Sequence, residues 1–233
     1  MSVIIMTKDN LPKTIHELGT GASSISYKTD NGLVLKRYCN NETYKKINEI
    51  HKYHFLDYLV ELSKLESSIL VVPKDIYINE PNMVAAQTYP YQVGMTLNEM
   101  YPKTNVANLY KALEEFYNIL IRIDYLKLRD MHYKNIIYTG SIKLLDLDFS
   151  LFTNEKNVVK ENLAHINEYI IKGIFKIDPL KKIEVDSNLQ ELLNSSLNGE
   201  INALEFLLQY QKMLIDKNGV CQYVKHLSKD FIK

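Results

Sequence analysis

The fold of this chain is decided by one stretch of sequence: Leu128-Arg129-Asp130-Met131-His132-Tyr133-Lys134-Asn135-Ile136-Ile137, followed by Ile142-Lys143-Leu144-Leu145-Asp146-Leu147-Asp148. Two apolar runs, at 136–138 and 142–145, flank the turn residues Thr139-Gly140-Ser141 and predict a β-hairpin. Because a hairpin brings its two ends together, we expect Asn135 and Asp146 to lie at one edge, with Asp130 just before them. Amide and carboxylate oxygens at one edge suit a hard cation such as Mg²⁺.

This stretch resembles the catalytic and metal loops of the protein kinase superfamily, H-R-D-x-x-x-x-N and D-F-G. Arg129, Asp130 and Asn135 match the first motif, and Asp146 matches the first residue of the second. The resemblance implies that Asp130 is the catalytic base and that Asn135 and Asp146 hold Mg²⁺ against the phosphates of ATP.

Three positions depart from those motifs. Leu128 stands in place of the motif's His, His132 occupies a position where serine/threonine kinases usually carry Lys, and Leu147-Asp148 replaces Phe-Gly. The last two departures resemble the small-molecule and atypical branches, such as aminoglycoside and choline kinases, more than eukaryotic-type protein kinases. On this resemblance Asp148 would assist the metal. His132 would touch the γ-phosphate or the acceptor, with a structural role in the loop as the alternative.

A glycine-containing loop lies near the N-terminus. Gly19-Thr20-Gly21 would let backbone N–H groups approach phosphate oxygens, although Ser24 replaces the third glycine of G-x-G-x-x-G and a plain hairpin turn explains the same residues. Lys36 follows on an alternating apolar run, where the resemblance places the lysine that pairs with the α- and β-phosphates. We therefore assign Gly19, Thr20, Gly21 and Lys36 to the binding of ATP.

Residues 41–65 predict a helix that could be interrupted, because apolar residues recur there at three- and four-residue intervals. The resemblance makes this segment the C-helix, whose glutamate pairs with the strand lysine. Glu61 is the expected partner of Lys36, with Glu49 and Asp57 as alternatives.

Two further strands are predicted at 68–78 and 83–89, and the alternating pattern is then lost over residues 90–97. The resemblance makes this region the hinge, which hydrogen-bonds the adenine through its backbone. Gln87 and Tyr89 are among the candidates for that contact. We place the boundary between the lobes here, which gives an N-lobe of residues 1–90 and a C-lobe of residues 91–233.

The C-lobe is predicted to be mainly helical, with helices at 105–127, 161–175, 187–197 and 200–215. The first of these is expected to end directly before the Asp130 loop. No A-P-E motif follows Asp148, which indicates a reduced lobe. The predicted fold class is therefore α+β: a bilobal protein kinase-like fold, with a small antiparallel β-sheet and a C-helix in the N-lobe and a reduced, helical C-lobe.

Bulk composition limits the partners and the location. The 28 basic and 28 acidic residues balance, so the charge supports binding to neither nucleic acid nor a membrane. No run of about 18 apolar residues occurs, and the apolar run at the N-terminus is too short for a signal peptide. Cys39 and Cys221 match no metal spacing and suit a reducing compartment. We expect a cytoplasmic protein.

The expected function is transfer of the γ-phosphate of Mg-ATP to a hydroxyl group, either of a protein at Ser or Thr or of a small molecule. The alternative is a pseudokinase, which would act as a nucleotide-binding or regulatory module on a partner protein. The missing motif His, Ser24 and the altered metal loop favour the pseudokinase. The charged and amide groups expected to touch metal and phosphate are all present, which favours the enzyme.

Overall fold

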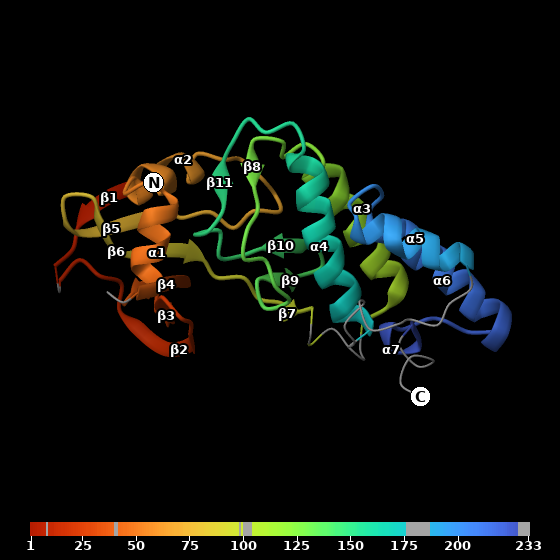
Figure 1. The fold of residues 1–233 in the computed structure, drawn as a ribbon. Coiled ribbons are helices and arrows are strands. Elements are labelled where there is room, and N and C mark those ends of the chain that lie inside the picture. The colour runs from red at the N-terminus through yellow and green to blue at the C-terminus, as the bar shows by residue number, and fades with distance from the viewer. Residues whose placement is uncertain (8, 40–41, 98, 100–103, 176–186, 228–233) are drawn as a thin grey trace. The chain divides into compact units, whose positions relative to one another are not determined.

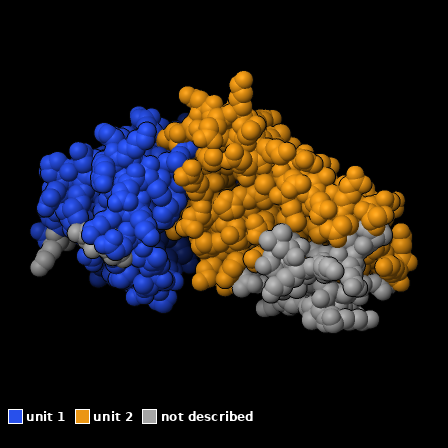
Figure 2. All heavy atoms as spheres, in the orientation of Figure 1, with its two compact units in different colours: residues 1–93, 147–151 blue, residues 94–146, 152–233 orange. Residues whose placement is uncertain are grey.

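The computed structural model describes residues 1–233 except 8, 40–41, 98, 100–103, 176–186 and 228–233 (Figure 1). The chain divides into two compact units, shown in different colours in Figure 2. Unit 1 comprises Met1–Val93 with Leu147–Leu151, and unit 2 comprises Gly94–Asp146 with Phe152–Lys233. The short segment that follows Asp146 therefore belongs with the N-terminal residues.

Unit 1 is built on a six-stranded sheet in the order β1-β5-β6-β4-β3-β2. The strands are β1 (Ser2–Ile5), β2 (Thr14–Thr20), β3 (Ser24–Thr29), β4 (Leu33–Tyr38), β5 (Asp75–Glu80) and β6 (Met83–Pro90). Neighbouring strands pair antiparallel, except that β1 pairs parallel with β5. The sheet is therefore mixed: the predicted antiparallel sheet is formed by β2 to β6, and β1 adds a parallel strand at one edge. The four residues of β1 are too few to show a strand period in the sequence.

Two short helices follow β4 in the chain, α1 (Glu42–Ile50) and α2 (Phe55–Leu62). The predicted interruption of this helical segment is confirmed; residue 41, its predicted start, lies outside the described residues. At the break Lys52 and Tyr53 adopt left-handed backbone angles, with φ of 51° and 63°. Two consecutive residues in this region cannot continue a right-handed helix, so the chain turns sharply between α1 and α2.

Aromatic side chains pack α1 and α2 against β4. The Tyr38 ring lies 5.2 Å from that of Tyr44 on α1 and 5.7 Å from that of Phe55 on α2. At the helix break the His51 ring stacks on Tyr58, with the ring centroids 4.0 Å apart. These contacts give α1, α2 and the break between them a fixed place over the sheet of unit 1.

The segment before β5 was predicted as strand from residue 68, but β5 begins only at Asp75. Ile69, Leu70 and Val71 are buried without forming part of a named strand. The Ser67 hydroxyl accepts hydrogen bonds from the Ile69 and Leu70 N–H groups at 3.3 and 3.4 Å, which turns the backbone there. An apolar run can be buried in an irregular segment as well as in a strand, and the sequence pattern does not separate the two cases.

Unit 2 contains a three-stranded sheet in the order β10-β9-β7. Its strands are β7 (Met95–Thr96), β9 (Ile136–Tyr138) and β10 (Ile142–Leu144), and β8 (Leu126–Lys127) is a further short strand of this unit. The short strand β11 (Leu151–Phe152) has one residue in each unit. The predicted hairpin is confirmed as β9 and β10, with Gly140 at φ 93° in its turn. Gly94, which precedes β7 in the chain, lies very close to this hairpin. A Cβ at this position would come within 2.5 Å of the Tyr138 carbonyl oxygen.

The described helices of unit 2 are α3 (Val106–Leu120), α4 (Val158–Phe175), α5 (Ser187–Leu197), α6 (Ala203–Asn218) and α7 (Val224–Leu227). The three predicted helices at 161–175, 187–197 and 200–215 are confirmed as α4, α5 and α6, with ends that differ by up to three residues. The start of α6 is set by Asn202, whose side chain accepts a hydrogen bond from the Glu205 N–H at 3.2 Å.

The first helix of the C-terminal half ends earlier than predicted. The prediction extended it to residue 127, whereas α3 ends at Leu120. The buried residues Ile123 and Leu126 keep the helical spacing by coincidence, while the backbone around them forms turns and the strand β8. The Asp130 loop is therefore reached through an extended segment that needs its own support.

No described helix is long and apolar enough to cross a lipid bilayer. The longest, α4, has 18 residues, and charged side chains interrupt its apolar residues along its length. Its buried positions are instead those of a core helix in a globular unit.

Candidate functional site

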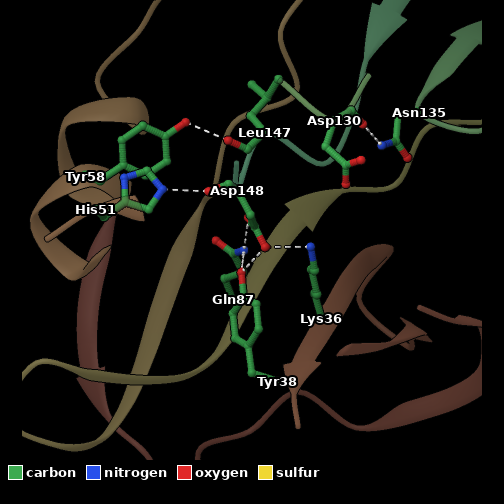
Figure 3. Close-up of polar contacts among 9 residues, drawn as sticks. All are labelled: Lys36, Tyr38, His51, Tyr58, Gln87, Asp130, Asn135, Leu147 and Asp148. Atoms are coloured by element: carbon green, nitrogen blue, oxygen red, sulfur yellow. Dashed lines mark hydrogen bonds and ion pairs between the residues drawn. The ribbon is translucent and has the colours of Figure 1, made fainter. Parts of the chain in front are cut away.

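The Asp130 loop lies in unit 2 and is organised by its own backbone. Asp130 is solvent-exposed and adopts a left-handed backbone conformation, with φ of 53°. The Asn135 side-chain Nδ2 donates to the Asp130 carbonyl oxygen at 3.1 Å (Figure 3). The Asn135 N–H donates to the His132 carbonyl oxygen at 2.8 Å. Among the described residues no donor meets the Asp130 carboxylate, so that group remains available to an external partner.

The hairpin β9/β10 holds the two ends of the candidate metal loop in register. Leu144 lies opposite Ile136, and the Leu145 N–H donates to the Asn135 carbonyl oxygen at 2.8 Å. Asp146 is the next residue and has a left-handed φ of 55°, which Asp tolerates better than most residues. The register thus brings Asn135 into direct backbone contact with the residue that precedes Asp146.

His132 has a structural role in this loop. Its Nδ1 accepts a hydrogen bond from the Lys134 N–H at 3.2 Å, and its ring lies 6.0 Å from that of Tyr133. The bond to Nδ1 places the proton of a neutral ring on Nε2. The alternative named from the sequence, a structural loop histidine, accounts for these contacts, and a contact of Nε2 with phosphate stays a prediction.

A buried asparagine on α4 supports the extended segment that leads to Asp130. The Asn162 Oδ1 accepts from the Leu128 N–H at 2.8 Å, and its Nδ2 donates to the carbonyl oxygens of Leu126 at 2.9 Å and Ile123 at 3.4 Å. Sequence reasoning missed Asn162. The signal was an amide within the apolar stripe of a helix, because such a side chain must find hydrogen-bond partners when it is buried.

In unit 1, Lys36 forms a buried ion pair with Asp148 (Figure 3). The Lys36 Nζ lies 2.7 Å from the Asp148 Oδ2, and the two side chains are 7% and 1% exposed. The Tyr38 hydroxyl donates to the same oxygen at 2.5 Å, and the Gln87 Nε2 donates to the Asp148 Oδ1 at 3.1 Å. Both carboxylate oxygens are therefore occupied by donors from β4 and β6.

The backbone that carries Asp148 is also held within unit 1. The His51 Nε2 hydrogen-bonds to the Asp148 carbonyl oxygen at 2.6 Å, and the Tyr58 hydroxyl donates to the Leu147 carbonyl oxygen at 2.6 Å (Figure 3). Because that carbonyl can only accept, His51 Nε2 must be the donor and carry a proton. The helix break and α2 thus fix Leu147 and Asp148, while the sheet fixes the Asp148 carboxylate.

Comparison with solved structures identifies the fold. An apo pseudokinase matches 87% of this chain over 80% of its own length, with a TM-score of 0.59 and 13% identity. The pseudokinase DRIK1 (drought responsive inactive kinase 1), solved with bound ENMD-2076, matches 87% of this chain over 81% of its own, with a TM-score of 0.57 and 12% identity. The chain has a protein kinase-like fold. No protein-family model matches the sequence, and neither does any curated protein.

The kinase-like fold confirms the predicted α+β class. The lysine on the strand, however, does not pair with the helix acid that was predicted as its partner. Glu61 pairs with Lys64 at 2.5 Å, and Asp57 pairs with His54 at 3.0 Å, with all four side chains more than half exposed. Glu49 is also exposed. Lys36 pairs with Asp148 and Glu61 pairs with Lys64, so the predicted pairing of Lys36 with Glu61 was wrong.

Asp148 was expected to assist the metal of a kinase-like site, whereas the structure gives its carboxylate partners within unit 1. Its carboxylate is buried, carries an ion pair and accepts further hydrogen bonds on both oxygens. A metal ion would have to displace Lys36 or the neutral donors to reach it. Among the described residues no group of three or more His, Cys, Asp or Glu side chains could hold a metal ion.

The hinge assignment is corrected at one residue. Gln87 lies opposite Lys36 on β4 and opposite Ile76 on β5, so both sides of its backbone face paired strands. An interior position of this kind leaves no backbone group for an adenine. Tyr89 has a Cα partner on β4 only, Val34, and its contact with adenine stays a prediction.

The glycine loop forms the turn between β2 and β3. Neither the backbone angles nor the local packing of this turn requires glycine at position 19 or 21. Neither Gly19 nor Gly21 has a positive φ. A Cβ at Gly19 would meet no atom within 4 Å, and one at Gly21 would make an ordinary contact of 3.6 Å with the Ser24 carbonyl oxygen. The Thr20 hydroxyl donates to the Glu17 carboxylate at 2.9 Å.

Proposed function

We propose that this protein is an ATP- and Mg²⁺-dependent phosphotransferase that passes the γ-phosphate to a hydroxyl group of a protein or of a small molecule. The observation that carries the proposal is the Asp130 loop: an exposed carboxylate without a donor among the described residues, followed by an asparagine tied to the carbonyl of the same aspartate. A group that must receive a proton from a substrate needs this availability.

Asn135 and Asp146 are the residues that would hold Mg²⁺. The Asn135 Nδ2 is used by the Asp130 carbonyl, which leaves its Oδ1, the type of oxygen that Mg²⁺ binds. Asp146 follows the residue whose N–H bonds to the Asn135 carbonyl. When bound, the metal would neutralise charge on the phosphate oxygens. The donor set of one amide oxygen and one carboxylate fits a cation that keeps several waters and binds phosphate.

In unit 1, Lys36 and the Gly19 to Gly21 turn would contact the phosphates of ATP. Lys36 contributes a positive charge from a strand, and the glycines contribute backbone N–H groups without a Cβ in the way. The absence of any intramolecular requirement for glycine at 19 and 21 supports this role. Tyr89 and its neighbours on β6 remain our candidates for the adenine.

Asp130 would orient the acceptor hydroxyl and take its proton as the phosphoryl group is transferred. The transition state of phosphoryl transfer is loose, so positioning and electrostatic stabilisation contribute more than a strong base. An exposed aspartate at the tip of a loop that is tied by Asn135 and supported by Asn162 satisfies the positional requirement.

The second candidate function is a pseudokinase that binds nucleotide or a partner protein without transfer. The specific observation in its favour is that the Lys36 ammonium is buried and already paired with Asp148, a partner that must release it or share it with phosphate. The two solved structures reported above are also described as pseudokinases, at an identity that supports the fold alone.

The test is a transfer assay with the full chain, Mg²⁺ and γ-labelled ATP, first alone and then with panels of proteins and hydroxyl-bearing metabolites. Asp130→Asn tolerates the same left-handed φ, and we expect it to keep ATP affinity while turnover falls by about 10²- to 10⁴-fold. Asp146→Asn should lose the Mg²⁺-dependent part of ATP binding. Asp124→Asn, an exposed aspartate of the same unit, is the matched control.

Normal turnover by Asp130→Asn would remove the catalytic role from this residue. A rise in melting temperature with Mg-ATP, without release or transfer of the γ-phosphate to any acceptor, would favour the pseudokinase. Absence of both binding and transfer would leave the kinase-like fold without either nucleotide function.

A further inference from the structure

The arrangement around Asp148 has the features of a built site rather than a chance contact. Lys36 and Tyr38 are two residues apart on β4 and so point to the same face of the sheet, and Gln87 lies directly opposite Lys36 on β6. Three donors therefore converge on one carboxylate from adjacent positions of two paired strands. The Gln87 Nε2 also donates to the Tyr38 hydroxyl, which links the neutral donors to each other.

Burial makes these contacts energetically significant. A carboxylate that is 1% exposed would be strongly destabilised without its cation and its donors. The helix break and α2 add two hydrogen bonds to the backbone of the same segment, from His51 and Tyr58. Five side chains from β4, β6, the helix break and α2 are thus committed to holding a two-residue segment in place.

We propose that Asp148 is the positioning residue for Lys36, and that it takes the role that the kinase resemblance assigns to a helix glutamate. Tyr38 and Gln87 orient the Asp148 carboxylate, and His51 and Tyr58 hold its backbone. This inference rests on the proposed contact of Lys36 with the phosphates of ATP. It differs from that function in naming the acid that orients the lysine and the part of the chain that supplies it.

One consequence concerns how the lysine is controlled. If a helix acid held Lys36, rotation of α1 or α2 would set the position of the ammonium. Here the acid lies two residues after Asp146 in the chain, so the conformation of the segment that follows the candidate metal ligand sets it. The helices act on Lys36 indirectly, through the bonds from His51 and Tyr58 to the Asp148 and Leu147 backbone.

The experiment follows the Lys36 ammonium directly by NMR on the full chain labelled with ¹⁵N-lysine. A buried ammonium held by a carboxylate exchanges its protons slowly, so we expect a resolved signal that Lys36→Met removes and thereby assigns. Asp148→Asn should abolish this signal or shift it strongly, whereas Glu61→Gln should leave it unchanged. This readout requires neither ATP nor turnover.

Mg-ATP titration of the same variants then tests the functional part. We expect Asp148→Asn to weaken ATP binding by about 10- to 100-fold, the range for loss of one charge-assisted hydrogen bond, and Glu61→Gln to have no effect. Tyr38→Phe keeps the ion pair and removes one donor, so a smaller loss is expected. It also provides the comparison if Asp148→Asn fails to fold.

The outcomes separate this inference from the proposed function. An ammonium signal that depends on Asp148 in a protein that binds no ATP would keep the positioning role in the apo protein and refute nucleotide binding. An ammonium signal or an ATP affinity that depends on Glu61 and not on Asp148 would overturn the inference, whether or not the protein transfers phosphate. An ATP affinity unchanged in both Asp148→Asn and Tyr38→Phe would also overturn it.

Discussion

Replacement of Asn162 by leucine tests how the Asp130 loop is supported. Asn162 is fully buried on α4, and its amide makes hydrogen bonds with the backbone of Leu128 and Leu126, just before the loop. Leucine has the same number of side-chain heavy atoms as asparagine, the same branch at Cγ and a higher helix propensity, so Asn162→Leu mainly removes the hydrogen bonds while α4 is retained.

The expected magnitude follows from the groups that lose a partner. Leu126 and Leu128 are buried, and a buried N–H or C=O left unsatisfied costs about 1–3 kcal/mol. Two such groups cost about 2–6 kcal/mol, and the added apolar burial of leucine offsets about 1–2 kcal/mol. We expect a net loss of about 1–4 kcal/mol, which lowers the melting temperature of a chain of this size by about 2–16 °C.

The assay combines thermal unfolding with hydrogen exchange at the Leu128 amide. Asn108→Leu, an exposed asparagine on α3, is the matched control, and its stability should change by less than about 0.5 kcal/mol. If Asn162→Leu has the same melting temperature as Asn108→Leu and the Leu128 amide stays protected from hydrogen exchange, Asn162 does not support the loop. A folded Asn162→Leu protein should also lose phosphotransfer, if the proposed function holds.

Three further predictions concern unit 1 and the surface of unit 2. Asp148→Leu alone should cost about 3–5 kcal/mol, because Lys36 keeps its buried charge, and addition of Lys36→Met should restore part of this loss in urea titrations. Gly19→Ala should leave the melting temperature unchanged or slightly higher while it weakens ATP binding, whereas Gly32→Ala, at φ 76°, should destabilise by about 1–2 kcal/mol. Hydrogen bonds to Glu155 and Glu161 raise the pKa of Lys127, and the hydrogen bond from Lys127 lowers the pKa of Glu155. The stabilisation from Glu155 is therefore present above its ordinary pKa of 4.5 and is lost as pH falls through the lowered folded value, while that from Lys127 is lost as pH rises through a value above 10.5. Melting curves of Lys127→Met should consequently lie below wild type at neutral pH and approach it in acid.

Much of the fold could be predicted because its signals are local. The β9/β10 hairpin is encoded by two apolar runs and the turn at Gly140, and α4, α5 and α6 by apolar residues at helical spacing. The errors in the predicted helix and strand boundaries also arise from local sequence patterns. Ile123 and Leu126 continue the spacing of α3 without its backbone, and β1 is too short to be distinguished from an unstructured end.

The residues of the candidate site likewise fall into those that the sequence predicted and those that it did not. Asp130, Asn135 and Asp146 lie within 17 residues of sequence, and their motif spacing identified them without coordinates. Gln87 was assigned to the hinge because its place in an interior strand depends on β4 and β5, which the sequence order does not reveal. Asn162 was missed because its partners lie 34 to 39 residues earlier in the chain.

The sequence by itself therefore determined the fold class, the hairpin and the identity of the loop residues, since spacing and turn chemistry act between neighbours in the chain. Only the tertiary structure decided which acid meets Lys36. Asp148 lies 112 residues away from it, and Glu61, the nearer choice on the predicted helix, is exposed and paired with Lys64. A buried charge takes the partner that the fold brings to it, and that choice depends on how β4, β6 and the segment after Asp146 pack together.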